Sequence, residues 1–471
     1  MATLTLEKPP QTEEGRKFWL GSLFIGAGRC VALGLGFAVN LLLVRIATKA
    51  NVGNYYLLLQ AINAAVLFSH LGLSSATLRF LPLCRSLPEP RQRLLRTLFS
   101  MQATMWLAVG LVLGLTWPWI ATQLNATVLR PELLLTIAAI GLISFNHLFD
   151  SCFRALRHYQ VSALLSGTAP RLTIACIFAA MYFAQSQQPL HYLALAFVGG
   201  HAVCTLGYFV AWFAVSRRKA NSETSEQLSN EEISDTSYEP PQSRELVSTT
   251  VSMGLREGVS VFLVASDLFV LSWCGFSDDV AIYGVALALL QAIAILPAIA
   301  NQIVPQEFSV LFKNKQLDQL ESLTRTSATI VTILAMITVG VYFVVGPWAI
   351  KTLFGPGYVG CYPVLAILLV GRLVDICCGS AGFLLQMTGQ HMRLLVLNIV
   401  VAVANIILSV ALALSYGAIG VAIATAISLM ALNLLMVLAV KKHVGVNSHC
   451  YFSLSDLRQV FDKVFGRMKR N

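Results

Sequence analysis

Three arginines lie near the middle of long apolar segments, where a charged side chain is costly. Arg29, Arg171 and Arg372 each fall about 15–16 Å along their segments, counted at about 1.5 Å per helical residue. An arginine at the centre of a bilayer costs about 2.5–3.5 kcal/mol on insertion scales, so it persists where it lines a wet cavity or has a partner. Because a guanidinium binds phosphate oxygens through paired hydrogen bonds, these arginines predict a binding site for an anionic headgroup.

Neighbouring residues distinguish the three arginines from one another. Asp375 follows Arg372 by three residues, so an intrahelical ion pair is the alternative at that position. Arg29 and Arg171 have no acidic residue within one helical turn, which favours a cavity for both. Pro170 removes one helical hydrogen bond beside Arg171, and broken helices at membrane depth are tolerated where they line a cavity. A plain kink is the alternative for Pro170.

Other charged residues in the apolar segments are candidates for ion coupling or for gating contacts. Arg256 and Asp267 are eleven residues apart, which is three helical turns and therefore one face. Asp267 is the deepest carboxylate without a sequence neighbour to pair with, and Asp375 is a second acidic candidate. Arg79 and Glu307 fall at matching ends of two segments, where they either close an inner gate or extend their polar ends to the interface.

The composition requires a bilayer around the elements that carry these residues. Of 471 residues, 56% are hydrophobic and 12% are charged, which is far from the balance of a soluble domain or a disordered chain. We expect an all-α polytopic membrane protein, because a crossing of the hydrocarbon needs about 20 apolar residues. The expected transmembrane helices span 18–45, 54–81, 97–119, 132–153, 161–183, 190–215, 247–274, 280–303, 326–348, 362–387, 394–416 and 418–440.

The loop charges predict the orientation of these twelve helices. If both termini are cytoplasmic, the cytoplasmic tails and loops hold most of the 33 lysines and arginines. The opposite loops then hold only Lys49, Arg130 and Lys351, which is a strong positive-inside asymmetry. The net charge of +10 is explained by a cytoplasmic rim that faces anionic lipid, so no nucleic-acid partner is expected.

The chain is expected to contain two related halves, each with six helices. Tyr55 opens the second helix and Tyr283 opens the eighth, with similarly spaced charged residues around both. Six helices per half require the two copies to point the same way, as in a parallel, pseudo-symmetric repeat. The predicted parts are a tail (1–17), a six-helix lobe (18–216), a flexible polar linker (217–246), a second six-helix lobe (247–441) and a basic amphipathic tail (442–471).

The sequence contains no recognisable catalytic apparatus. The ten cysteines are scattered within apolar runs and are interpreted as small hydrophobic residues. Walker A, metal-ligand and nucleophile-elbow motifs do not occur, and no extramembranous segment is long enough for a catalytic domain. We therefore expect neither an enzyme nor a cofactor nor a bound metal.

Short motifs in the sequence resemble polysaccharide-type flippases of the multidrug/oligosaccharidyl-lipid/polysaccharide (MOP) exporter superfamily. They include Arg29, VGNY at 52–55 and GLSSATLRFLP at 72–82, and two similar elements, ALRHY at 155–159 and MTGQH at 387–391. The resemblance implies two six-helix bundles of the multidrug-exporter (MATE) type. It also implies flipping of an undecaprenyl-diphosphate-linked oligosaccharide across a bacterial inner membrane by alternating access, for lipopolysaccharide O-antigen, capsule or exopolysaccharide. Membrane lipids, a polysaccharide polymerase and glycosyltransferases are the partners that it implies.

Two other functions remain open at this stage. A cation-coupled drug antiporter of the same superfamily favours a carboxylate in the first helix, where this sequence has Arg29 and no acid. Asp267 keeps that alternative open. A membrane scaffold for polymer assembly that transports nothing is the second alternative, and an assay of headgroup flipping in vesicles separates it from a transporter.

Overall fold

The computed structural model describes residues 13–84, 88–123, 132–156, 158–184, 188–226, 250 and 266–451. Its contacts divide the chain into two compact units, residues 1–261 and 262–471. All regular structure in the described ranges is helical, in agreement with the predicted all-α class. The division between the units falls among residues outside the described ranges, so the predicted lobe boundaries stay a prediction.

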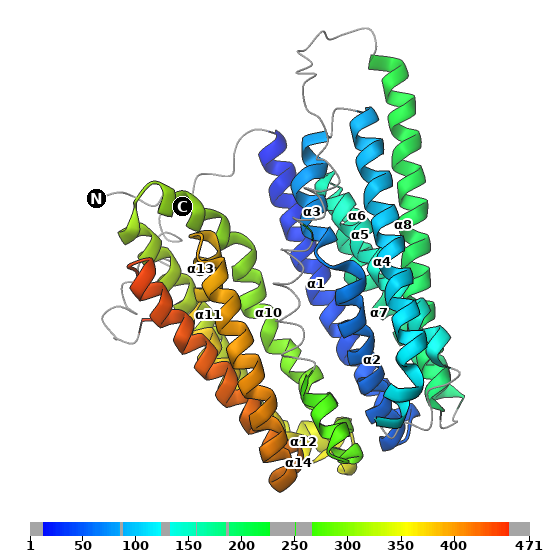
Figure 1. Ribbon diagram of the computed structural model, residues 1–471, viewed down its shortest axis with the longest axis vertical. Coiled ribbons are helices and arrows are strands. Elements are labelled where there is room, and N and C mark those ends of the chain that lie inside the picture. The colour runs from blue at the N-terminus through cyan, green and yellow to red at the C-terminus, as the bar shows by residue number, and fades with distance from the viewer. Residues whose placement is uncertain are drawn as a thin grey trace. The chain divides into compact units, whose positions relative to one another are not determined.

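The first unit is a bundle of long helices that run alongside one another (Figure 1). Its elements are α1 (Glu13–Ile46), α2 (Lys49–His70), α3 (Leu73–Phe80), a 3-10 turn (Leu81–Cys84), α4 (Pro88–Gln123), α5 (Glu132–Ala155), α6 (Tyr159–Ala163), a π turn (Leu164–Thr168), α7 (Ala169–Phe183) and α8 (Leu190–Glu226).

Close packing in this unit depends on small residues facing large ones. The Trp106 indole on α4 donates from Nε1 to the Ile137 carbonyl of α5 over 2.9 Å. A Cβ added at Gly141 would lie 2.6 Å from that indole nitrogen, so only glycine fits there. Leu58, Ile140 and Ala194, from α2, α5 and α8, belong to one buried apolar cluster.

One predicted helix of the first unit is broken in the structure. The sequence predicts a single helix over 54–81, but α2 ends at His70 and α3 begins at Leu73. Leu71 and Gly72 between them have positive φ angles of 26° and 79°. Glycine adopts a positive φ without steric cost. The regular helix therefore stops before Gly72, and a new helix starts after it. The sequence-based interpretation missed the break because the surrounding residues remain apolar.

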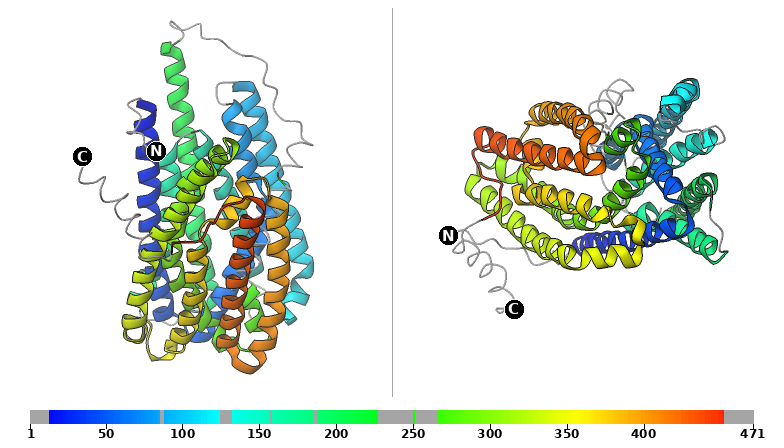
Figure 2. Two further views of the ribbon diagram at one scale, coloured as in Figure 1. Left: turned by 90° about the vertical axis from the view of Figure 1, so that its left-hand side faces the viewer. Right: turned by 90° about the horizontal axis from the view of Figure 1, so that it is seen from below.

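The second unit contains a described helical segment at 266–273 and five named helices. These are α10 (Ser277–Lys313), α11 (Leu317–Leu353), α12 (Cys361–Cys378), α13 (Ala381–Met387) and α14 (His391–His443). A 3-10 turn, Pro356–Tyr358, lies between α11 and α12. Within this unit the long helices pack lengthwise, as both views of Figure 2 show.

Glycines with positive φ also mark the breaks of the second unit. The predicted helix 362–387 divides into α12 and α13 at Gly379, whose φ is 70°. The predicted helices 394–416 and 418–440 are the two arms of α14, which fold back on each other at Gly417 with φ 55°. The Ala418 amide donates to Asp279 Oδ2 over 2.9 Å, which satisfies a backbone group freed by this turn.

The described helices fit a membrane environment. Eight of them are long and apolar enough to cross a bilayer, and each of the twelve predicted segments contains at least part of a described helix. Large apolar side chains such as Val344 (81% exposed) and Phe183 (79% exposed) point away from the protein, as lipid contact requires. The chain is a multi-pass membrane protein.

Helix α8 extends beyond its predicted end. It continues through 217–226 into the predicted linker, where no proline or glycine ends it.

Candidate functional site

A π turn interrupts the helix that carries Arg171. The chain passes from α6 through Leu164–Thr168 into α7, and the Ala169 amide bonds to the Leu164 carbonyl five residues earlier. Pro170 follows, and because it has no N–H it cannot continue the regular pattern. Interruptions of this kind are frequent at functional sites in helices. The helical run over 160–183 thus continues past Pro170 with a π turn in place of regular α geometry before it.

Two side-chain hydrogen bonds tie this turn to neighbouring helices, one received from α8 and one donated to α1. Cys204 on α8 donates from Sγ to the Leu165 carbonyl over 3.0 Å. Thr168 donates from Oγ1 to the Gly28 carbonyl of α1 over 3.3 Å. The turn is thus held between α1 and α8, which fixes the direction of the helix that follows it.

The Arg171 side chain lies along α1 in a space that two glycines leave open. A Cβ added at Gly36 would lie 3.6 Å from Arg171 Nε, and one added at Gly167 would lie 3.3 Å from Nη1. Nη1 donates to the Gly167 carbonyl over 3.2 Å, which is the one hydrogen bond of this guanidinium among the described residues. No carboxylate in the described part of the first unit pairs with it. Within the described ranges, this half-buried guanidinium thus has no neutralising carboxylate.

Arg29 lies on α1, the helix along which the Arg171 side chain lies. It precedes Gly36 by seven residues, two helical turns, so its α-carbon is on the α1 face that contacts the Arg171 side chain. The Arg29 side chain is outside the described part of the structure, as are the side chains of Arg79 and Glu307. Arg256 lies in the stretch 251–265, which is also outside it. The roles predicted for these four residues stay predictions.

Arg372 in the second unit is paired within its own helix. Its Nη1 lies 2.8 Å from Asp375 Oδ2, so the intrahelical alternative raised by the sequence is the arrangement that forms. Asn433 on α14 lies beside Asp375. This pair neutralises the charge that an anionic ligand would need.

Asp267 is buried among hydroxyl and amide groups without a basic partner in the described ranges. It is 1% exposed, and it accepts hydrogen bonds from Tyr283 Oη at 2.5 Å and Thr425 Oγ1 at 2.9 Å. Asn405 lies beside this carboxylate. The Asn405 amide and the Ser409 hydroxyl, both buried, make no hydrogen bond of good geometry to any described residue. An uncompensated buried carboxylate of this kind is suited to bind a proton or a small cation.

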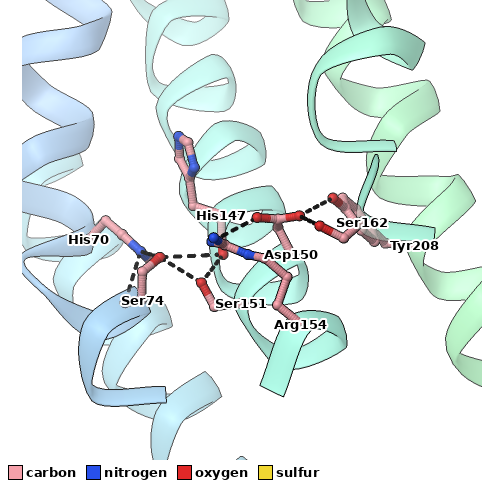
Figure 3. A network of polar contacts seen from close by, with 8 residues as sticks. All are labelled: His70, Ser74, His147, Asp150, Ser151, Arg154, Ser162 and Tyr208. Carbon is pink, nitrogen blue, oxygen red and sulfur yellow. Dashed lines mark hydrogen bonds and ion pairs between the residues drawn. The ribbon is translucent and has the colours of Figure 1, made fainter. Parts of the chain in front are cut away.

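The sequence-based interpretation missed a polar network in the first unit, drawn in Figure 3. Asp150 on α5 pairs with Arg154 Nη2 at 2.9 Å. It also accepts hydrogen bonds from Ser162 of α6 at 2.5 Å and from Tyr208 of α8 at 3.4 Å. The i, i+4 spacing of Asp150 and Arg154 was the available signal. Because Arg154 neutralises Asp150, the network joins three helices and is not a free charge.

His70 and the His147 backbone take part in a neighbouring set of polar contacts, also drawn in Figure 3. His70 contacts Ser74 Oγ through Nε2 at 2.6 Å and Gln102 Oε1 through Nδ1 at 2.8 Å. Ser151 donates to Ser74 Oγ at 2.7 Å and to the His147 carbonyl at 2.8 Å (Figure 3). These contacts join α2, α3, α4 and α5. They place His70 in a structural network and give no proton pathway.

Solved structures with the same fold are transporters. The lipid II flippase MurJ in an inward closed conformation matches with a TM-score of 0.69 and 14% identity, over 94% of this chain and 91% of that one. An inward-facing multidrug resistance MATE family transporter of the MOP superfamily matches with a TM-score of 0.67 and 15% identity, over 88% and 94%. A MOP superfamily transporter from Pyrococcus furiosus gives 0.62 and 15% identity, over 91% and 96%.

The sequence itself also matches a family model. No curated protein matches the chain in a sequence search. The model described as polysaccharide biosynthesis protein matches residues 18–310, more than half of the chain. The predicted resemblance and the predicted MATE-like helical class are both confirmed by these matches. The chain belongs to the polysaccharide biosynthesis protein family and has the fold of MOP superfamily transporters.

Proposed function

We propose that this protein flips a polyprenyl-diphosphate-linked oligosaccharide across a bacterial inner membrane by alternating access, for surface polysaccharide biosynthesis. The family match supports the pathway, and the likeness to MurJ supports a lipid-linked cargo. Related transporters with inward-facing and outward-facing conformations support alternating access. Lipopolysaccharide O-antigen is one such polymer, and the corresponding polymerase and glycosyltransferases are the proposed partners. Both termini are placed in the cytoplasm by the loop charges.

The observation that carries this proposal is that the Arg171 guanidinium has no ion pair among the described residues. This guanidinium is half-buried in a membrane-spanning helix, and within the described residues it makes one hydrogen bond and no ion pair. A cation held in this way attracts an anion, and a diphosphate supplies the paired oxygens that a guanidinium binds best. We assign Arg171 and Arg29, on adjoining helices, as the headgroup-binding residues. Arg372 has a weaker role because Asp375 already neutralises it.

Asp267 is the proposed coupling residue of the transport cycle. It is a buried carboxylate with two hydroxyl donors, and the Asn405 amide beside it lacks a hydrogen-bond partner of good geometry among the described residues. Binding of a proton or a monovalent cation there would compensate its charge. Flipping driven by a pH gradient alone, or by a sodium gradient alone, identifies which of the two is coupled.

The test is polymer export in cells that lack the native gene. Arg171→Ala is expected to reduce surface polysaccharide at least 10-fold, because a lost charged hydrogen-bond pair costs about 1.5–3 kcal/mol. Arg171→Lys keeps the charge but loses the planar fork, and it should restore export only in part. Arg393→Ala, at an exposed arginine of α14, is the matched control and should export normally. Wild-type output from an Arg171→Ala protein that is present in the membrane contradicts the proposal.

A cation-coupled drug antiporter is the second candidate, since the buried Asp267 and the MATE-like fold favour it. In that case Asp267→Asn would raise drug accumulation in cells and leave polysaccharide export unchanged. A membrane scaffold would support export in cells and show no headgroup flipping in reconstituted vesicles. The flippase proposal predicts flipping in those vesicles and no drug phenotype for Asp267→Asn.

A further inference from the structure

The chain after α14 returns across the second unit in a short, well-packed segment, residues 444–451, which we call the strap. Val446, Ser448 and Cys450 of the strap are 1%, 0% and 3% exposed. A Cβ added at Gly379 would lie 2.6 Å from the Ser448 carbonyl oxygen. The strap therefore packs tightly against the glycine that separates α12 from α13.

Polar contacts hold the strap to α11. Asn447 donates from its backbone N and from Nδ2 to the two carboxylate oxygens of Glu321, at 3.1 and 3.0 Å. The Arg325 guanidinium, paired with Glu321 at 3.3 Å, lies 4.0 Å from the centre of the Tyr451 ring. The Tyr451 amide donates to Thr329 Oγ1 over 2.9 Å. These bonds fix the position of the residues on either side of Cys450.

Two cysteines meet where the strap crosses the end of α12. The Cys450 amide donates to the Cys377 carbonyl over 2.9 Å. The Cys377 and Cys450 side chains adjoin each other, and Thr332 of α11 lies beside both. A backbone hydrogen bond between two residues keeps their α-carbons near the roughly 4.4–6.8 Å that a disulfide spans. Both cysteines are free thiols in this structure.

The surroundings give the two sulfurs different roles. Cys377 is half-buried, whereas Cys450 is buried, so an oxidant in solution reaches Cys377 first. The adjoining Cys377 side chain, together with burial, raises the pKa of the Cys450 thiol. Cys450 therefore remains a thiol while Cys377 reacts with the oxidant.

We propose that Cys377 and Cys450 form an oxidative modification site, in which a reversible disulfide fixes the strap to α12. In the first step the Cys377 thiol reacts with a peroxide ROOH, so that an S–O bond forms, the O–O bond breaks, and the products are a sulfenic acid and ROH. In the second step the Cys450 sulfur attacks the Cys377 sulfur and water leaves with the Cys450 proton. The peroxide is reduced by two electrons and the two thiols are oxidised by two.

The disulfide would close a long loop that contains α13 and all of α14. Cross-links over long loops restrict the unfolded chain most, and we expect a rise of a few degrees in the melting temperature of the oxidised protein. Disulfides that form transiently from contacting thiols are typically redox-sensing rather than structural. This inference is independent of the transported cargo.

The experiment uses the purified full-length protein, treated with hydrogen peroxide and then alkylated to block remaining thiols. Mass spectrometry of the digested protein is expected to find the Cys377 peptide linked to the Cys450 peptide, and dithiothreitol should abolish the link. Cys450→Ser and Cys377→Ser should each remove both the link and the rise in melting temperature. Cys378→Ser is the matched control, because that buried thiol adjoins Cys377, and it should leave both intact.

Three results would overturn the inference. One is a wild-type protein whose Cys377 and Cys450 are fully alkylated after peroxide treatment. Another is a link that disappears in Cys378→Ser and persists in Cys377→Ser. The third is oxidation of Cys377 to a sulfinic or sulfonic acid without any link. Cys450→Ala serves in place of Cys450→Ser if the latter fails to elute as a folded protein.

Discussion

The two units carry opposite uncompensated charges. The first unit holds Arg171, a guanidinium with no ion pair among the described residues, while its buried acid Asp150 is paired with Arg154. In the second unit Arg372 is paired with Asp375, and the buried acid Asp267 has only neutral donors there. Among the described residues, the two units thus differ in which charge lacks a partner. This difference is the basis on which we propose anion binding in the first unit and cation coupling in the second.

Two tyrosine hydrogen bonds, at positions that the predicted repeat offsets by one residue, also end on acceptors of different charge. In each unit a tyrosine hydroxyl donates to a side chain sixteen residues earlier: Tyr56 to Asn40 at 2.6 Å, and Tyr283 to Asp267 at 2.5 Å. The acceptor is a neutral amide in the first unit and a carboxylate in the second. Asn40 also donates to the Gly36 carbonyl at 2.7 Å, next to the Arg171 side chain. A carboxylate at position 40 would add a negative charge one helical turn from Gly36, where the Arg171 side chain lies.

The largest expected effect is at the acid of the second unit. Asp267→Asn keeps an acceptor for Tyr283 and removes the charge, so the fold should persist and ion-driven flipping in vesicles should fall to the background rate. Headgroup binding should remain within about 2-fold of wild type, because the arginine site lies in the other unit. Retained ion-driven flipping in this variant would remove the coupling role of Asp267.

Asn40→Asp tests the difference between the units by adding a carboxylate to the first one. The substitution replaces the N–H donor to the Gly36 carbonyl by a second oxygen, and it adds a negative charge beside Arg171. We expect a loss of about 1–3 kcal/mol in stability, visible in thermal unfolding, and a clear loss of headgroup affinity. Asn40→Ser, which removes the amide without adding charge, is the control. Unchanged headgroup affinity in Asn40→Asp would show that the Arg171 charge does not bind the cargo.

A third change asks whether Arg372 can be made to resemble Arg171. Asp375→Asn leaves the Arg372 guanidinium without its carboxylate and so frees a cation in the second unit. Removing one partner of a buried pair destabilises by up to about 3–5 kcal/mol, and this site is partly exposed, so we expect less. Pyrophosphate should protect the variant against thermal unfolding more than it protects the wild type. Equal protection of both proteins would indicate that pairing does not set anion affinity.

The smallest expected effect concerns the π turn. Cys204→Ala removes the sulfur donor to the Leu165 carbonyl, and we expect a loss of about 0.5–1.5 kcal/mol in stability. Cys204→Ser keeps a donor and should lose less. Flipping should fall only modestly in either variant, since Pro170 still interrupts the helix. A large loss of flipping with unchanged stability would instead assign Cys204 to the transport pathway.

Local features of this site were predictable from sequence, whereas contacts between helices were not. The depth of Arg171 and the pairing of Arg372 with Asp375 follow from residue spacing within one helix. The π turn depends on an acceptor from α1 and a donor from α8, and no spacing near Pro170 indicates them. Asp267 and Tyr283 were each singled out by the sequence, but their hydrogen bond joins two helices and was not anticipated. The breaks at Gly72 and Gly379 were missed because apolar residues continue through them.

The central claim, that Arg171 holds a phosphorylated headgroup, is tested most directly by measuring binding of polyprenyl diphosphate to the purified protein by native mass spectrometry. Wild-type protein and Arg393→Ala should bind it with equal affinity, and Arg171→Ala should bind it at least 10-fold more weakly. Equal affinity in Arg171→Ala and wild type would contradict the claim.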